Sequence, residues 1–301
     1  MNVTPWAASG WTETRRMSTT LPEGNVKEYF VKSNSDPIAK TMFAGEFASL
    51  DRLYDLVPSS CPKPYGWGEY ATNPGSYFII MEFLYLVPEL PDESKITLLI
   101  SKIHQTTAGT SSDGKRFGFY LPTCHGKIAQ PNQWDDNWAR FYAKLLDVFY
   151  KEDMNSNGPL AEYERAHEIL LEHTIPRLLG ALQAEGRVLT PCLVHGDFWQ
   201  ENLGINEETG ETMLYDPILF YGHNEFEIGM WRTLTVPFAE SYRKQYFLRI
   251  PPSQPAEECD DRNRLYSLFY HTSLSAHWPG ASEEVRARYA QAPAPPQADM
   301  S

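Results

Sequence analysis

The sequence LVHGDFWQENLGI spans residues 193–205, and a second short segment, MLYDP, follows at residues 213–217. An apolar run leads into His-Gly-Asp, which predicts a strand that delivers a loop, with a glycine that lets the backbone turn tightly. The interval from Asp197 to Asp216 has room for a loop, a strand, a turn and a second strand. These two segments decide the fold, because they place two carboxylates and one side-chain amide on successive elements.

The three side chains are Asp197, Asn202 and Asp216. Phosphoryl transfer from ATP needs one carboxylate that positions the attacking hydroxyl and accepts its proton, and it needs oxygen ligands for the magnesium that bridges the phosphates. The triplet supplies both kinds of group. The alternative is a turn in which Asp197 makes an Asx bond and Asn202 caps a helix. The triplet alone does not decide between these interpretations.

A second constellation lies near the N-terminus. Lys32 ends a predicted strand at residues 27–32, and Glu46 lies on the helix that follows, which Asp36-Pro37 is expected to cap. A lysine that reaches nucleotide phosphates is held in place by such a helix carboxylate in kinase-type sites, although two solvated surface charges would look the same in sequence. A bilobal kinase has, in chain order, a lysine on a strand, a glutamate on the next helix, an apolar strand and an Asp/Asn/Asp triplet. This sequence has the same order, which favours the kinase interpretation.

Four segments carry a resemblance to a known family. HGDFWQEN at residues 195–202 and LYDPILFYGHNEFEIGM at residues 214–230 resemble the catalytic and metal-binding blocks of the fructosamine/ketosamine kinases, relatives of aminoglycoside phosphotransferases. The central segment FGFYLPTCHGKIAQPNQWDDNWARFYA, residues 117–143, and MFAGEFASL, residues 42–50, are similar to two more blocks of that family. The likeness covers about residues 9–280.

The resemblance implies a role for each matching residue. Asp197 would be the catalytic base, and Asn202 and Asp216 would be the magnesium ligands. Lys32 would contact the α- and β-phosphates of ATP and be held by Glu46. These implied roles agree with the chemistry argued from the residues themselves.

The resemblance also places the nucleotide base and the acceptor. The backbone from Glu82 to Leu84 would bind the adenine edge, and Trp199, beside the base, would form part of the sugar-binding wall. Three further residues are placed on the acceptor side, with packing as the open alternative for each: His223, Glu225 and Trp278. His195 is expected to brace the loop through a backbone contact.

The nucleotide-covering loop departs from the family pattern. A glycine-rich loop is expected there, but ASGWTETRRMSTTLPEG, residues 8–24, has Gly10 as the one glycine at its front. Ser9 and Gly10 are expected to turn the chain over the phosphates, with serine and threonine hydroxyls as added donors. A nearby G-x-G-x-x-A match, Gly66–Ala71, follows a proline-rich bend instead of a strand, so a loop is expected there and not a dinucleotide site.

Composition limits the possible partners. The 301 residues carry a formal charge of −13, which argues against nucleic-acid binding. The four cysteines are widely spaced and form no C-x-x-C pair, the N-terminus lacks the apolar core of a signal peptide, and no apolar run reaches membrane-spanning length. We therefore expect a cytoplasmic protein with no membrane or nucleic-acid partner, and the resemblance implies a small-molecule or glycated-amine substrate. The oligomeric state stays open.

The fold predicted from these observations is α+β and kinase-like, with two lobes. A β-rich nucleotide-binding lobe would cover residues 1–85, and a mainly helical catalytic and acceptor-binding lobe would cover residues 86–289, before a disordered Pro/Ala-rich tail at residues 290–301. The expected reaction is ATP- and Mg²⁺-dependent transfer of the γ-phosphoryl group to a ketosamine sugar hydroxyl, a deglycation. The alternatives are another hydroxyl acceptor, such as an aminoglycoside or a choline-like metabolite, or a kinase-like protein that binds nucleotide without catalysis.

Overall fold

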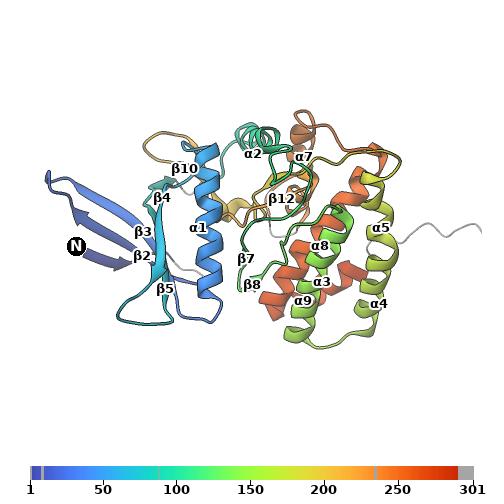
Figure 1. The fold of residues 1–301 in the computed structure, drawn as a ribbon, viewed down its shortest axis with the longest axis horizontal. Coiled ribbons are helices and arrows are strands. Elements are labelled where there is room, and N and C mark those ends of the chain that lie inside the picture. Colours follow the sequence, from blue (N-terminus) through green and yellow to red (C-terminus); the bar gives the residue numbers. More distant parts are fainter. Residues whose placement is uncertain (1, 8–9, 88, 234–235, 291–301) are drawn as a thin grey trace, which may run out of the picture. The chain divides into compact units, whose positions relative to one another are not determined.

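The computed structural model describes residues 2–7, 10–87, 89–233 and 236–290. Its contacts divide the chain into two compact units. The first consists of Met1–Ile96, Leu121–Ala129 and Asp197–Leu219, and the second of Thr97–Tyr120, Gln130–Gly196 and Phe220–Ser301. The first is built on an antiparallel sheet and the second is mainly helical (Figure 1). The sheet-bearing unit therefore includes three stretches that follow residue 85: residues 86–96, Leu121–Ala129 and Asp197–Leu219.

The first unit contains a five-stranded antiparallel sheet with the order β1-β2-β3-β5-β4. Its strands are β1 (Asn2–Pro5), β2 (Glu13–Thr20), β3 (Val26–Asn34), β4 (Pro64–Glu69) and β5 (Tyr77–Glu82). The strand predicted at residues 27–32 lies within β3, and β2 turns into β3 at Gly24, whose φ of +92° suits glycine. The sheet gives β3 a neighbour on both sides, which holds Lys32 in a fixed place.

The loop predicted at residues 66–71 is wrong in part, because Gly66–Glu69 belong to β4. This strand lies at the edge of the sheet and pairs only with β5, in a register that sets Trp67 opposite Ile79. An edge strand tolerates proline and glycine, which made the segment look like a loop. The conclusion that it is no dinucleotide site does not depend on this correction.

Helix α1 (Ala39–Leu56) packs against β4 and β5 beside the sheet (Figure 1). Its buried face includes Phe43, Leu50 and Leu53, which are spaced as a helix requires. The predicted capping by Asp36-Pro37 is wrong: the cap position is Ile38, without a side-chain hydrogen bond. The Asp36 carboxylate instead forms an ion pair of 2.8 Å with Lys127.

Shorter elements complete the first unit. A three-stranded sheet has the order β11-β10-β6, and β7 pairs with β8 in a hairpin. The bounds are β6 (Leu86–Val87), β7 (Cys124–His125), β8 (Ile128–Ala129), β10 (Leu203–Asn206) and β11 (Thr212–Leu214), with a 3₁₀ turn at Gln200–Asn202. The predicted order of loop, strand, turn and strand between Asp197 and Asp216 is confirmed.

The second unit is built from helices around one two-stranded pair, β9 (Cys192–Val194) with β12 (Phe220–Gly222). The helices are α3 (Trp138–Asn157), α4 (Ala161–Ile169), α5 (Ile175–Leu178), α6 (Asn224–Glu227), α7 (Glu240–Phe247), α8 (Cys259–His277) and α9 (Ser282–Ala290), with 3₁₀ turns at Gly180–Gln183, Met230–Arg232, Ala256–Glu258 and Pro279–Ala281. Helix α2 (Glu93–Thr107) begins in the first unit and ends in the second. The buried Ile96, Ile100 and Ile103 of α2 follow helical spacing.

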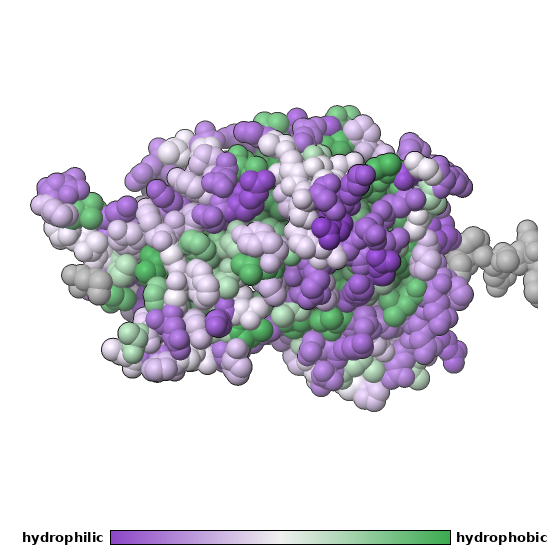
Figure 2. Space-filling model, viewed as in Figure 1, coloured by the Kyte–Doolittle hydropathy of each residue, from purple (hydrophilic) through white to green (hydrophobic). Residues whose placement is uncertain are grey.

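The core of the second unit is aromatic. Trp138 on α3 is fully buried, and its Nε1 donates a hydrogen bond of 2.7 Å to the Tyr266 hydroxyl on α8. Tyr142, one turn further along α3, donates to the Leu265 carbonyl at 2.6 Å. The visible surface over these helices is mostly hydrophilic, apart from small apolar areas (Figure 2). Burial of these aromatic side chains away from water stabilises the packing of α3 against α8.

The helix type changes just ahead of Pro176. Residues Leu170–Thr174 form a π-helix between α4 and α5, and Pro176 is in the first turn of α5. Proline has no N–H to donate to the preceding turn, so the wider turn ahead of it accommodates the missing hydrogen bond.

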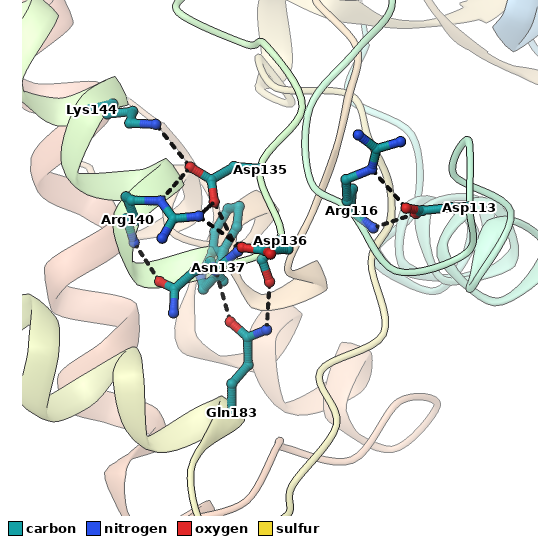
Figure 3. Close-up of polar contacts among 9 residues, drawn as sticks. Asp113, Arg116, Asp135, Asp136, Asn137, Arg140, Lys144 and Gln183 are labelled. Carbon is teal, nitrogen blue, oxygen red and sulfur yellow. Dashed lines mark hydrogen bonds and ion pairs between the residues drawn. The ribbon is translucent and has the colours of Figure 1, made fainter.

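Charged side chains surround the start of α3 (Figure 3). The Asp135 carboxylate accepts hydrogen bonds from Arg140 and from Lys144, the latter at 2.9 Å, while only 5% of the residue is exposed. Burial alone would raise the pKa of Asp135, but these hydrogen bonds outweigh burial and lower the pKa to about 2. Gln183 caps the N-terminus of α3, because its Oε1 accepts a hydrogen bond of 2.8 Å from the backbone N–H of Trp138.

Replacing Asp135 by asparagine is expected to lower the free energy of unfolding by about 2 kcal/mol at pH 7. A carboxyl whose folded-state pKa lies near 2 stabilises the fold above its unfolded value near pH ~4, and this stabilisation disappears as the pH falls through ~2. Urea unfolding at pH 7 and at pH 3 should therefore show a smaller difference between variant and wild type at acid pH. Asp136→Asn is the control, since that side chain is 78% exposed. If the difference in unfolding free energy between Asp135→Asn and wild type were the same at both pH values, the low pKa of Asp135 would be contradicted.

The tail predicted to be disordered, residues 290–301, falls outside the described residues except for Ala290, the last residue of α9. Among the helices of the described part, none combines the length and the hydropathy that crossing a membrane requires.

Candidate active site

Lys32 lies on β3 between two carboxylates of the first unit. Its Nζ is 2.8 Å from Oε1 of Glu46 on α1 and 2.6 Å from Oδ1 of Asp216, and only 7% of the lysine is exposed. Burial alone would lower the pKa of Lys32, but the two carboxylates outweigh it and raise the pKa above its ordinary value. The lysine therefore stays charged in the cavity, and its predicted ion pair with Glu46 is present.

The β10–β11 hairpin brings Asn202 and Asp216 together. Leu203 pairs with Leu214, so the residues that flank this pair also meet, and the Tyr215 N–H donates to the Asn202 carbonyl at 3.1 Å. Asp216 comes next with a φ of +56°, a left-handed conformation that is uncommon for a residue other than glycine. A strained backbone conformation of this kind persists only where the surrounding structure enforces it, and it is found most often at functional sites.

Asp197 contacts both Asn202 and the β7–β8 hairpin. Its Oδ2 accepts a hydrogen bond of 2.9 Å from Asn202 Nδ2, and its Oδ1 lies 3.1 Å from Nε2 of His125. The turn that delivers Asp197 contains Gly196 with a φ of +85°, as the His-Gly-Asp pattern predicts. Lys32, Glu46, Asp197, Asn202 and Asp216 therefore all line one cavity of the first unit, with a volume of about 490 Å³.

Other predicted residues line this cavity too. Glu82, Leu84, Gly10 and Trp199 all contribute to its wall, and Glu82 is the last residue of β5. The backbone that follows β5 is therefore beside the cavity, where a nucleotide edge could pair with it. Ser9 lies outside the described residues.

Several cavity residues were not predicted from the sequence. Trp6 and Trp11, from the segment on either side of Gly10, line the wall where the family has a glycine-rich loop. His125 is a third unpredicted residue, and its contact with Asp197 brings together residues 72 positions apart. The Cys-His-Gly triplet at residues 124–126 was visible in sequence, but nothing in its spacing connects it with Asp197.

Gly45 allows the segment before the β7–β8 hairpin to approach α1. A Cβ at Gly45 would collide with the Pro122 carbonyl oxygen and would lie 3.0 Å from Thr123 Cα. Both neighbours are backbone atoms, so they cannot move aside as a flexible side chain would. The glycine beside Glu46 therefore sets the position of the hairpin that carries His125.

We expect Gly45→Ala to lower the free energy of unfolding by about 1–3 kcal/mol, the usual cost of overpacking. The added methyl would push residues 122–123 away from α1, and kcat should fall because His125 moves with them. Thermal unfolding and steady-state kinetics check both effects. Ala44→Gly, at a half-buried position of the same helix, measures the helix propensity that Gly45→Ala gains, with the opposite sign. A Gly45→Ala protein that is more stable than wild type by that amount would show that the close approach is dispensable.

The donor set fits a magnesium ion. Asp216 offers a carboxylate, and Asn202 offers Oδ1, because its Nδ2 is directed at Asp197. Hard oxygen ligands in small number are what Mg²⁺ takes from proteins, with nucleotide phosphates and waters as the other ligands. Within the described residues no cluster of three or more histidine, cysteine or acidic side chains could hold a metal. The donors present therefore suit a phosphate-bound Mg²⁺ better than a protein-enclosed zinc ion.

The remaining predicted residues belong to the second unit. His223 is fully buried, its two ring nitrogens contact the Tyr266 and Ser253 hydroxyls, and burial lowers its pKa to about 4. Glu225 is equally buried and forms an ion pair of 2.7 Å with Arg262. These contacts support the packing alternative for both, and a substrate role stays a prediction. Trp278, which ends α8, is 50% exposed.

The backbone N–H of His195 is bound by a buried side chain of the second unit, while the bracing of the loop by His195 stays a prediction. The N–H groups of His195 and Gly196 both donate to the Glu227 carboxylate, the second at 3.1 Å. Glu227 is fully buried on α6, so this brace is rigid.

The fold and the cavity define a kinase-like phosphotransferase. A solved structure assigned as a fructosamine-3-kinase from Haemophilus somnus aligns with 97% of this chain and 90% of its own, with a TM-score of 0.72 at 19% identity. The aminoglycoside phosphotransferase APH(4)-Ia aligns with a TM-score of 0.60 at 14% identity, over 98% of this chain and 94% of its own. Both likenesses concern the fold.

The sequence model of the fructosamine kinase family matches residues 13–287, and the chain belongs to that family. A protein-ribulosamine 3-kinase, chloroplastic, from Oryza sativa subsp. japonica is 33% identical over 248 residues, which cover 82% of this chain and 67% of the rice protein. A ketosamine-3-kinase from Mus musculus is 29% identical over 274 residues, or 83% of this chain and 81% of the mouse protein. As a member of a kinase family, the chain is an ATP-dependent phosphotransferase.

Proposed function

We propose that this protein transfers the γ-phosphoryl group of ATP to a sugar hydroxyl of a ketosamine, the adduct of a sugar and an amine. The observation that supports this most is the single cavity in which Lys32, Glu46, Asp197, Asn202 and Asp216 meet. Membership of the fructosamine kinase family and the names of the rice and mouse relatives support the choice of acceptor.

In this proposal Asp197 positions the acceptor hydroxyl and takes its proton as the oxygen attacks phosphorus. Lys32, fixed by Glu46, neutralises charge on the phosphates, and Trp199 forms a wall beside the acceptor sugar. Asn202 and Asp216 would hold Mg²⁺, which would supply charge neutralisation for the transferred phosphoryl group. Catalysis here consists of positioning and electrostatic stabilisation, which these groups supply without a covalent intermediate.

A cytoplasmic location and a role in removing sugars from glycated amines belong to the same proposal. Phosphorylation of the sugar makes the ketosamine unstable, so the amine is released. The free thiols of the four cysteines, Cys61, Cys124, Cys192 and Cys259, are consistent with a reducing compartment. We include no membrane or nucleic-acid partner in this proposal.

An ADP-release screen tests the acceptor. Fructose-lysine and ribulose-lysine are compared with aminoglycosides and choline, each with ATP and Mg²⁺, and with ATP and EDTA as the metal-free control. We expect turnover with one or both ketosamines and none without the metal. Turnover with an aminoglycoside or choline alone would replace the acceptor assignment, while thermal stabilisation by ATP and Mg²⁺ without turnover of any acceptor would support a binding protein.

A further inference from the structure

His125 reaches the carboxylate of Asp197 from the β7–β8 hairpin. Its Nε2 is 3.1 Å from Oδ1 of Asp197, and the two side chains are 14% and 21% exposed. An ionised carboxylate only accepts hydrogen bonds, so the Nε2 that faces it carries the hydrogen. Because Asn202 Nδ2 donates to the other oxygen, Oδ2, at 2.9 Å, each oxygen of Asp197 has its own donor.

We propose that His125 is a positioning residue for Asp197, an inference that rests on the proposed function in which Asp197 is the base. The torsion that turns a carboxylate about its Cβ–Cγ bond has a broad minimum, so one donor leaves the group free to rock. Donors on both oxygens hold its plane. The acceptor hydroxyl then meets a carboxylate in a fixed orientation, which is what efficient proton transfer in a kinase-type site requires.

The hairpin that carries His125, the donor to Asp197, has contacts of its own. Gly126, between β7 and β8, turns the hairpin with a φ of +55°, and Lys127 anchors its tip through the 2.8 Å ion pair with Asp36. At the base of the hairpin, the close approach at Gly45 fixes Pro122 against α1. A hairpin anchored at its tip and at its base keeps the imidazole at a constant distance from the helix that carries Glu46.

Positioning and space-filling make different predictions for substitutions at His125. Leucine has a similar bulk but no donor, whereas the glutamine amide can place an N–H near the Nε2 position. If His125 only fills space, leucine should preserve the rate. If it holds Asp197, glutamine should preserve the rate better than leucine, with the KM for ATP unchanged because Lys32 and the backbone after β5 are untouched.

Steady-state kinetics of His125→Leu and His125→Gln test this. We expect kcat to fall about 10- to 100-fold in the leucine variant, the scale of a misplaced catalytic group, and to recover most of this loss in the glutamine variant. His173→Leu is the matched control, since that histidine is 59% exposed on the second unit. Wild-type kcat in His125→Leu, or equal kcat in the leucine and glutamine variants, would overturn the proposal.

A double-mutant comparison shows whether His125 acts through Asp197. In an Asp197→Asn background, His125→Leu should cause no further loss of the residual rate, because the carboxylate that it orients is already gone. If His125→Leu lowered the rate by the same factor in the Asp197→Asn background as in wild type, His125 would act on the substrate directly. This result would overturn the positioning role.

A measurement without acceptor separates this inference from the acceptor assignment. In protein with ¹⁵N-labelled histidine, the ring signals missing from His125→Gln belong to His125. We expect them to show the tautomer protonated on Nε2 and to shift in Asp197→Asn, while the His173 signals stay in place. Unshifted His125 signals would overturn the contact, and shifted signals in a protein that phosphorylates no ketosamine would leave the contact standing and reject the acceptor.

Discussion

Asp197→Asn is expected to lower kcat by about 10³-fold or more, with little change in the affinity for ATP, because general base catalysis contributes about 10²–10⁴-fold and orientation of the acceptor adds to it. Asparagine keeps the shape of the side chain and an oxygen near Asn202 and His125, but it cannot accept the acceptor proton. The nucleotide contacts proposed for Lys32 and for the backbone after β5 are not altered by this substitution, so the loss should appear in kcat.

Two measurements check this result together. Single-turnover phosphorylation reports the chemical step, and titration calorimetry with ATP and Mg²⁺ reports nucleotide affinity. Asp136→Asn, an exposed change on the second unit, serves as the control for the loss of one negative charge. Comparable turnover in Asp197→Asn would remove Asp197 from the role of base, and a large loss of ATP affinity would mean that its carboxylate binds the nucleotide or its metal.

Asp216→Ala is expected to reduce both the Mg²⁺-dependent affinity for ATP and the rate, with kcat/KM falling by about 10²–10³-fold. A metal ion supplies several kcal/mol of charge stabilisation in phosphoryl transfer, and each 1.36 kcal/mol is worth about tenfold. The substitution also removes the 2.6 Å partner of Lys32, which keeps its second partner, Glu46. Loss of the metal ligand, and not loss of the lysine, therefore dominates.

Metal titration distinguishes the two effects. At saturating ATP, the Mg²⁺ concentration that gives half-maximal rate should rise in Asp216→Ala, and Mn²⁺, which binds protein oxygens more tightly, should restore part of the activity. Glu46→Gln is the matched control, because it alters the other partner of Lys32 without touching a proposed metal ligand. An unchanged metal requirement in Asp216→Ala would count against Asp216 as a ligand.

Much of the cavity follows from local sequence signals. The apolar run before His-Gly-Asp predicts β9, and the turn residues between Leu203 and Leu214 predict the hairpin whose register brings Asn202 to Asp216. The contact of Lys32 with Glu46 follows from the order of one strand and the next helix. These contacts are predictable because each depends on neighbouring elements with clear periodicity or turn chemistry.

Other features depend on contacts between distant segments. The edge strand β4 looks like a loop because it contains one proline and two glycines, which a strand tolerates where one side lacks a partner. The position of His125 depends on the packing of residues 122–123 against Gly45, which no periodicity in either segment reveals. The contacts of His223 and Glu225 likewise come from Ser253, Arg262 and Tyr266, far along the chain.

The charges gathered around Lys32 have a consequence for the form in which the nucleotide enters. One ammonium faces the carboxylates of Glu46 and Asp216, and the carboxylate of Asp197 lines the same cavity, so acidic groups outnumber the lysine before any ligand arrives. A bare ATP tetra-anion would meet like charge there, whereas a complex with a divalent cation brings two compensating charges. We therefore expect the cavity to admit ATP with a bound divalent cation more readily than free ATP, before adenine or sugar is recognised.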